Sequence, residues 1–202
     1  MVTFAVMTVV ALVTSALTSR EKENAKKALE RERQTQALYL LTSHLTEAKE
    51  LSDAAETAVS VISDLLDCRA ACLCYDETGE PEKTFLQRTE EGKLVRRRLE
   101  NGKEVKKRLE NLRDPFYVGE EFYDWPVYGG EGILGVVRIP GERAEAFEET
   151  QKIFLHSMLE CVALAMDRIL AVRKQVRSRQ QIQQERYRGN LLLSLIHISE
   201  PT

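Results

Sequence analysis

His197 is the residue of this chain whose surroundings come nearest to a reaction centre. A histidine that accepts a phosphoryl group needs an acidic residue directly after it, which exchanges a proton with the imidazole and leaves one ring nitrogen nucleophilic. Here Ile198 follows His197, and the segment continues with Glu200-Pro201-Thr202. We therefore expect no catalytic residue in this chain and no enzymatic activity of its own.

The four cysteines are the next candidates for chemistry, as thiolate ligands or as a disulfide framework. Cys68, Cys72, Cys74 and Cys161 form no C-x-x-C pair, and Cys161 is far from the other three. Structural zinc sites bring their cysteines together in short pairs on turns. We expect buried, reduced cysteines that act as small apolar residues, with neither a metal nor a cofactor bound.

Four aromatic residues could line a small-molecule pocket. Tyr75, Phe85, Trp125 and Tyr128 all fall in or near short apolar stretches that are typical of strands. Such residues could face a pocket on the concave side of a sheet, or they could simply fill its core. Both interpretations stay open from the sequence.

A basic stretch occupies residues 93–113, where nine Lys or Arg residues stand close together. Three glutamates are interleaved with them, and no aromatic residue lies inside the stretch to stack on bases, so we expect no nucleic-acid partner. The net charge of -3 for the whole chain also gives no pull toward nucleic acid. A solvated charged helix or hairpin is the first interpretation, and contact with anionic lipid or an anionic ligand is the second.

The first predicted element is residues 1–18, which contain no charged residue. As a helix, this segment approaches the length that is needed to cross a bilayer. A secretory signal is the rival, but no basic residue precedes the apolar run. Arg20, Lys22, Lys26 and Lys27 follow it, so the positive-inside rule predicts a transmembrane helix with everything after about residue 19 in the cytoplasm.

Residues 19–50 contain neither Pro nor Gly and predict one continuous signalling helix. Leu38, Leu41, Leu45 and Ala48 recur at spacings of three, four and three, as in a coiled-coil seam. This apolar row either packs on the following domain or forms a parallel dimer. The isolated His44 beside it is expected at the surface.

Residues 51–170 predict an α+β domain, an antiparallel sheet packed on helices. Asp53 and Glu56 form a capping-box pattern for a helix through Leu66, with Ala55, Val59, Ile62 and Leu66 on its buried face. A strand over 70–75 and a hairpin of 122–128 with 133–139 follow. From about Glu145 a long helix is predicted to run to residue 192. The apolar stripe of this helix consists of Phe154, Met158, Cys161, Ala165 and Ile169. The stripe becomes sparse after Leu170, so residues 171–192 are expected to form a connector.

The strand ending in DETGE, the segment PVYGGEGILGVV and the long exit helix resemble a GAF-type sensor domain. With VTFAVMTVVALVTSALTSR before that domain and ERYRGNLL after it, the order resembles the middle of KdpD-type potassium sensor histidine kinases. The resemblance implies a homodimer in the bacterial inner membrane that uses ATP and magnesium and passes phosphate to a response regulator of potassium uptake genes. The acceptor histidine and the ATP-binding domain would lie beyond Leu192, so this part would sense and transmit.

Two alternatives keep the membrane-tethered GAF sensor and change its output, to a cyclic-dinucleotide synthase or to a non-catalytic scaffold. The last ten residues bear on the choice. Residues 193–202 read LSLIHISEPT, which resembles a translated sequencing adapter. We therefore expect His197, although it falls in the acceptor register, to be an artefact.

Overall fold

The computed structural model describes the backbone of residues 2–98 and 101–198, and the side chains of residue 18 and of residues 20–98 and 101–188. The chain divides into two units, residues 1–40 and 41–202, and helix α1 (Val2–Glu47) runs through both. Among the residues with described side chains, no helix is long and apolar enough to cross a membrane. The predicted transmembrane helix over 1–18 lies, apart from Thr18, outside those residues.

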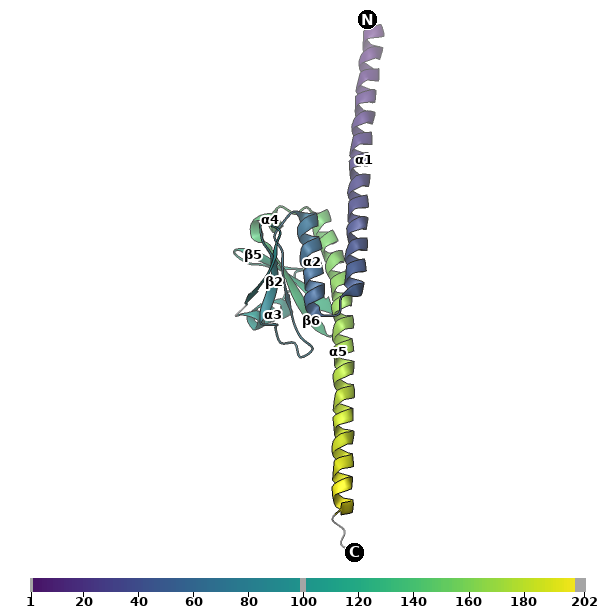
Figure 1. Cartoon of the computed structure of the whole chain (residues 1–202). Helices are drawn as coiled ribbons and strands as arrows, with labels where there is room; N and C mark the ends of the chain where they lie inside the picture. The colour runs from purple at the N-terminus through teal and green to yellow at the C-terminus, as the bar shows by residue number, and fades with distance from the viewer. Residues whose placement is uncertain (1, 99–100, 199–202) are drawn as a thin grey trace. The chain divides into compact units, whose positions relative to one another are not determined.

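The second unit is built on one antiparallel sheet of six strands in the order β3-β2-β1-β6-β5-β4 (Figure 1). These strands are β1 (Ala71–Cys74), β2 (Thr84–Arg88), β3 (Leu94–Arg98), β4 (Tyr117–Val118), β5 (Phe122–Gly129) and β6 (Gly132–Pro140). The predicted strand over 70–75 and the predicted hairpin are confirmed as β1 and as β5 with β6. The unit is α+β, as expected.

Helices α2 (Leu51–Leu66) and α5 (Glu149–Ile198) cover one face of the sheet (Figure 1). The four residues predicted for the buried face of α2 are all buried: Ala55, Val59, Ile62 and Leu66. On α5, Leu155, Met158, Val162 and Met166 are fully enclosed. A sheet face and a helix stripe that bury apolar residues against each other make the main core of the domain.

Helix α3 (Gly102–Glu110) lies on the other face, within the basic stretch. Val105 and Leu109 of this helix pack on Leu73, Tyr75 and Val136 of the sheet, while its Lys and Arg side chains point outward or lie at its edges. The hydroxyl of Tyr75 donates a hydrogen bond to the carbonyl of Gly102 at 3.1 Å. The basic stretch therefore contains both of the structures that were expected as alternatives. Leu94–Arg98 form strand β3 of the β2–β3 hairpin, and Gly102–Glu110 form the charged helix α3.

Two boundaries differ from the sequence prediction. Asp53 does not begin α2; it is the third residue of a helix capped by Glu50, and its carboxylate accepts hydrogen bonds from the backbone N–H groups of Lys49 and Glu50 at 3.1 and 3.0 Å. The predicted helix from Glu145 is a short helix α4 (Gly141–Glu145) followed by α5 from Glu149. In both cases a local backbone turn, which side-chain periodicity does not encode, sets the boundary.

The apolar row at the end of α1 packs within a single chain. Leu41, Leu45 and Ala48 are buried in the second unit, with 0%, 3% and 8% of their surface exposed. His44 is exposed, as expected. These three residues therefore favour packing on the following domain over a seam between two copies.

Candidate functional site

The four aromatic residues predicted to line a pocket do not meet at one place. Tyr75 and Phe85 lie on the face covered by α3, where Tyr75 is fully buried and Phe85 packs at the edge of the same cluster. A cavity between Phe85 and Val105 of α3 holds about 20 Å³, roughly the space for one water molecule, and a separate groove of about 230 Å³ also borders Phe85. This pair mainly completes the α3 core.

Trp125 lies on the opposite face of the sheet. It pairs with Val137, which pairs in turn with Cys72, so all three point to the side of α2 and α5. Its ring stacks on Phe116 at 4.8 Å between centroids and lies 6.4 Å from the ring of Phe147. Tyr128 is 50% exposed. The sequence showed aromatic residues near strands, but a bulge and the strand register decide which face each one reaches.

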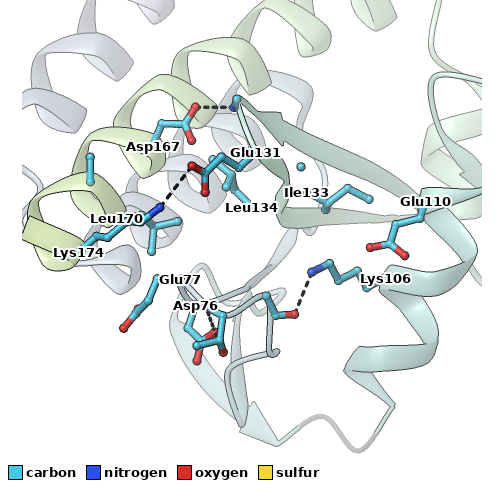
Figure 2. A pocket seen from close by; sticks show the side chains of 15 residues that line it. Asp76, Glu77, Lys106, Glu110, Glu131, Ile133, Leu134, Asp167, Leu170 and Lys174 are labelled. Carbon is cyan, nitrogen blue, oxygen red and sulfur yellow. Dashed lines mark hydrogen bonds and ion pairs between the residues drawn. The ribbon is translucent and has the colours of Figure 1, made fainter. Parts of the chain in front are cut away.

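The sheet and the exit helix share an open pocket of about 480 Å³, which we call the junction pocket (Figure 2). Four segments line it: the turn 76–79, helix α3, the β5–β6 turn and one side of α5. Leu134 and Leu170 supply apolar lining, and seven of the other lining residues are charged: Asp76, Glu77, Lys106, Glu110, Glu131, Asp167 and Lys174. Two turns that lie about 50 residues apart in the sequence thus meet α5 at one place.

Asp76 organises the first of these turns. Its Oδ1 accepts hydrogen bonds from the backbone N–H groups of Thr78 and Glu80 and from the Thr78 hydroxyl, at 2.8, 3.0 and 2.6 Å. Partial burial raises the pKa of Asp76, but these hydrogen bonds outweigh it and the net pKa is lowered. Gly79 closes the turn with a positive φ of 76°, a backbone conformation that is unfavourable for residues with a side chain. The carboxylate is therefore a fixed anion that holds the turn.

Polar contacts tie both turns to α5. Asp167 accepts a hydrogen bond from the backbone N–H of Gly130 at 2.9 Å, and Lys174 lies 3.4 Å from the carboxylate of Glu131 (Figure 2). Arg177, one turn further along α5, forms an ion pair with Glu77. These contacts therefore link both turns to the part of α5 that leaves the sheet.

Arg168, the neighbour of Asp167, joins α5 to the end of α1. Its guanidinium donates hydrogen bonds to the backbone carbonyls of Leu45, Thr46 and Ala48, at 2.9, 3.0 and 2.9 Å. These carbonyls belong to the unsatisfied, partly negative end of a helix, where a cation is favoured. Arg173 adds a 3.5 Å contact with Glu50. One helix thus contacts both the incoming helix and the sheet turns.

Sequence reasoning did not single out Asp167 or Arg168. Both are charged residues set between the apolar stripe residues Ala165 and Ile169, on a helix that elsewhere keeps its charges away from the core. That placement was the available signal, but the partners are main-chain atoms more than 30 residues away. No side-chain pattern identifies such a partner before the fold is known.

The described residues of this unit offer binding and positioning groups more than reactive ones. Burial raises the pKa of the Cys68 thiol to about 11, and a contact with Cys72 together with burial raises that of Cys74. A thiol with a raised pKa is a poor nucleophile. Among the described residues, no cluster of His, Cys, Asp and Glu could hold a metal ion.

The fold is that of a GAF domain. The structure aligns with the GAF domain of the potassium sensor histidine kinase KdpD from Escherichia coli with a TM-score of 0.54 and 19% identity, over 70% of this chain and 99% of that one. The GAF domain of a putative sensor histidine kinase from Pseudomonas syringae pv. tomato aligns with a TM-score of 0.49 and 13% identity, over 76% of this chain and 98% of that one.

The sequence is similar to that of the sensor protein KdpD from Clostridium acetobutylicum, with 25% identity over 205 aligned residues. The alignment covers 98% of this chain and 23% of the length of that protein. No protein-family model matches the chain. The predicted resemblance to KdpD-type sensor kinases is thus confirmed, and this chain spans about a quarter of the length of the KdpD relative that it matches.

Proposed function

We propose that this chain is the sensory and signal-transmitting part of a membrane-bound sensor histidine kinase. Its similarity to a KdpD sensor protein over 98% of its length supports this role, and so does its GAF fold. In this role the domain changes the position or stability of α5, and α5 carries the change onward.

The observation that carries the proposal is the set of contacts made by residues 167–177 of α5. Within these three helical turns, Asp167, Lys174 and Arg177 bind the two sheet turns and Arg168 binds the end of α1. Beyond them, residues 178–188 of α5 are exposed. An output helix that packs on its domain, makes its last contacts with it at residues 167–177 and is exposed afterwards can respond to small changes in that domain.

The proposed membrane topology, oligomeric state and signalling partner follow from the resemblance to KdpD-type sensor kinases. In it, residues 1–18 cross the bacterial inner membrane, the rest is cytoplasmic, and two copies form a homodimer. A catalytic part that uses ATP and magnesium passes phosphate to a response regulator of potassium uptake genes. The apolar, uncharged residues 1–18 and the basic residues after them support this orientation.

A chimera tests the proposal. Residues 1–192 of this chain would replace the matching segment of the sensor protein KdpD from Clostridium acetobutylicum, and autophosphorylation would be measured in membranes over a range of potassium concentrations. We expect phosphorylation that still changes with potassium, because the graft supplies an equivalent domain and output helix.

The control chimera carries a flexible Gly/Ser linker in place of residues 51–170 of the graft. It keeps both flanking helices and removes the domain. If the two chimeras phosphorylate to the same extent at every potassium concentration, the domain transmits nothing and the proposal is wrong.

A further inference from the structure

We propose that the open part of the α3-side sheet face binds a small anion that carries an aromatic group. A groove of about 230 Å³ lies there, lined by three arginines among apolar and amide side chains. We call it the arginine groove and define it by the residues that the argument uses: Arg69, Phe85, Gln87, Arg97, Phe122 and Arg138. This site is distinct from the junction pocket.

Strand register brings these residues together from five segments. Gln87 pairs with Ala71, and Ala71 pairs with Arg138, so their side chains share one face across β2, β1 and β6. Phe85, two residues before Gln87, pairs with Arg97 of the edge strand β3. Helix α3 packs on this face around Leu73 and Tyr75, and the part of the chain that the structure describes leaves the end near Ala71 open.

The charge of the groove favours an anion. None of the described residues that line it is acidic. Arg138 is held by Asp124 through two hydrogen bonds of 2.6 and 2.8 Å, which raises the pKa of Arg138 and fixes its guanidinium. Arg69 pairs with Glu90, but the side chains are 49% and 79% exposed, so solvent weakens that pair.

Arg97 is the cation that remains available. Its side chain is exposed, and no described carboxylate lies within ion-pairing distance of it. A guanidinium presents donors in a planar fork that matches a phosphate or carboxylate, and the bond is stronger where an apolar wall excludes water. Arg97 therefore supplies the main anion contact, with Gln87 as a neutral donor beside it.

The apolar side of the groove favours a ring on the same ligand. Phe85 and Phe122 are half-buried, and the guanidinium of Arg138 lies 5.6 Å from the centroid of the Phe122 ring. Ala71 and Pro140 supply flat lining between them. A planar group can lie against these surfaces while its anionic substituent reaches Arg97. The groove is too small for a large ligand, since sites for drug-sized molecules start at about 300 Å³.

The binding assay uses phenyl phosphate as the probe, with inorganic phosphate and phenol as its two separate halves. Each is titrated into the full 202-residue chain by calorimetry, and the site is located from backbone amide shifts in NMR spectra. We expect saturable binding of phenyl phosphate that is stronger than binding of either half, with the largest shifts at Ala71, Gln87 and Arg138.

Neighbouring arginines of β3 provide matched variants. Arg97→Gln removes the cation that faces the groove and should weaken phenyl phosphate binding about tenfold. Arg98→Gln removes an exposed arginine that points to the other face, and should leave binding unchanged. Equal weakening by both variants would mean a diffuse basic surface and would overturn the proposal. So would an absence of binding, or shifts confined to the junction pocket. The assay needs no kinase, so its result is independent of the proposed signalling role.

Discussion

The two faces of the sheet are built from the same strands, yet they differ in how they are covered. The face toward α2 and α5 is enclosed by two long amphipathic helices, and its residues Cys72, Val137 and Trp125 are almost fully buried. The face toward α3 has one helix of nine residues, which covers Leu73 and Tyr75 and leaves the arginine groove open. The first face stabilises the domain, whereas the second has surface available for a ligand.

The difference extends to the polar groups that each face contains. The α3 side holds the buried carboxylate of Asp124, paired with Arg138, within a strand that is otherwise apolar at its centre. A buried ion pair costs desolvation energy and is weak evidence for stability. Its presence on the open face is consistent with a surface shaped for binding, where a fixed cation is useful.

The largest effect should come from the closed face. Leu155→Ala removes a fully buried side chain of α5 and leaves a cavity, so we expect the free energy of unfolding to fall by about 3 kcal/mol. Urea denaturation of the purified chain measures it. Leu164→Ala on the same helix is the control, because Leu164 is 72% exposed. If both variants lose the same stability, α5 does not pack on the sheet in the way described.

A smaller loss is expected when the ion pair of the open face is broken. Asp124→Asn leaves Arg138 without its charged partner, which should cost about 2 kcal/mol because the Arg138 side chain is 28% exposed and water partly compensates. The same urea assay applies, with the exposed Asp114→Asn as control. An unchanged midpoint would show that the pair contributes nothing and that solvent reaches Asp124.

The Arg168→Gln variant tests the hydrogen bonds between α5 and the end of α1. These hydrogen bonds belong to neither face of the sheet. The variant loses the charged donors to Leu45, Thr46 and Ala48, and we expect a loss of about 1 kcal/mol with faster hydrogen exchange confined to residues 41–50. Arg179→Gln, at an exposed position further along α5, should change neither quantity. Faster exchange throughout the domain would instead mean a general loss of stability.

The smallest effect should be seen at Asp76, and it should depend on pH. Because the folded pKa of Asp76 is lowered, its contribution to stability is present above its ordinary pKa of 3.8 and is lost as the pH falls through the folded value. Asp76→Asn should therefore be less stable than the parent chain by less than about 1 kcal/mol at neutral pH, since the group is largely exposed. The difference should shrink below pH of about 4.

Thermal unfolding of the Asp76→Asn variant and of the parent chain from pH 3 to pH 7 measures this difference in stability. The exposed Asp114→Asn serves again as the matched control. A difference that stays constant over the whole range would mean that the hydrogen bonds to Thr78 and Glu80 do not depend on the charge of Asp76.

Much of the closed face could be predicted from the sequence. The buried side of α2 follows from helical periodicity in Ala55, Val59, Ile62 and Leu66, and all four are buried. The β5–β6 hairpin follows from two apolar runs around a glycine-rich turn. In these segments, local periodicity and turn residues agree with the final fold, so the prediction was confirmed.

The open face could not be predicted to the same depth. Strand β3 has the sequence LVRRR, in which three consecutive arginines hide the alternation of an edge strand. The pocket residues predicted together, Tyr75 and Trp125, point to opposite faces, because strand pairing decides the side that each one reaches. The role of Arg168 also stayed hidden, since its partners are backbone carbonyls.

The sequence by itself determined the buried side of α2, the central hairpin and the resemblance to KdpD-type sensor kinases, because these depend on residues close together in the chain. The tertiary structure decided which side chains meet. It separated Trp125 from Tyr75, placed Arg97 beside Phe85, and brought Asp167 to the Gly130 turn. Strand register and helix packing are long-range choices, fixed by burial of the whole core, and for that reason the sites they create appear only in the folded domain.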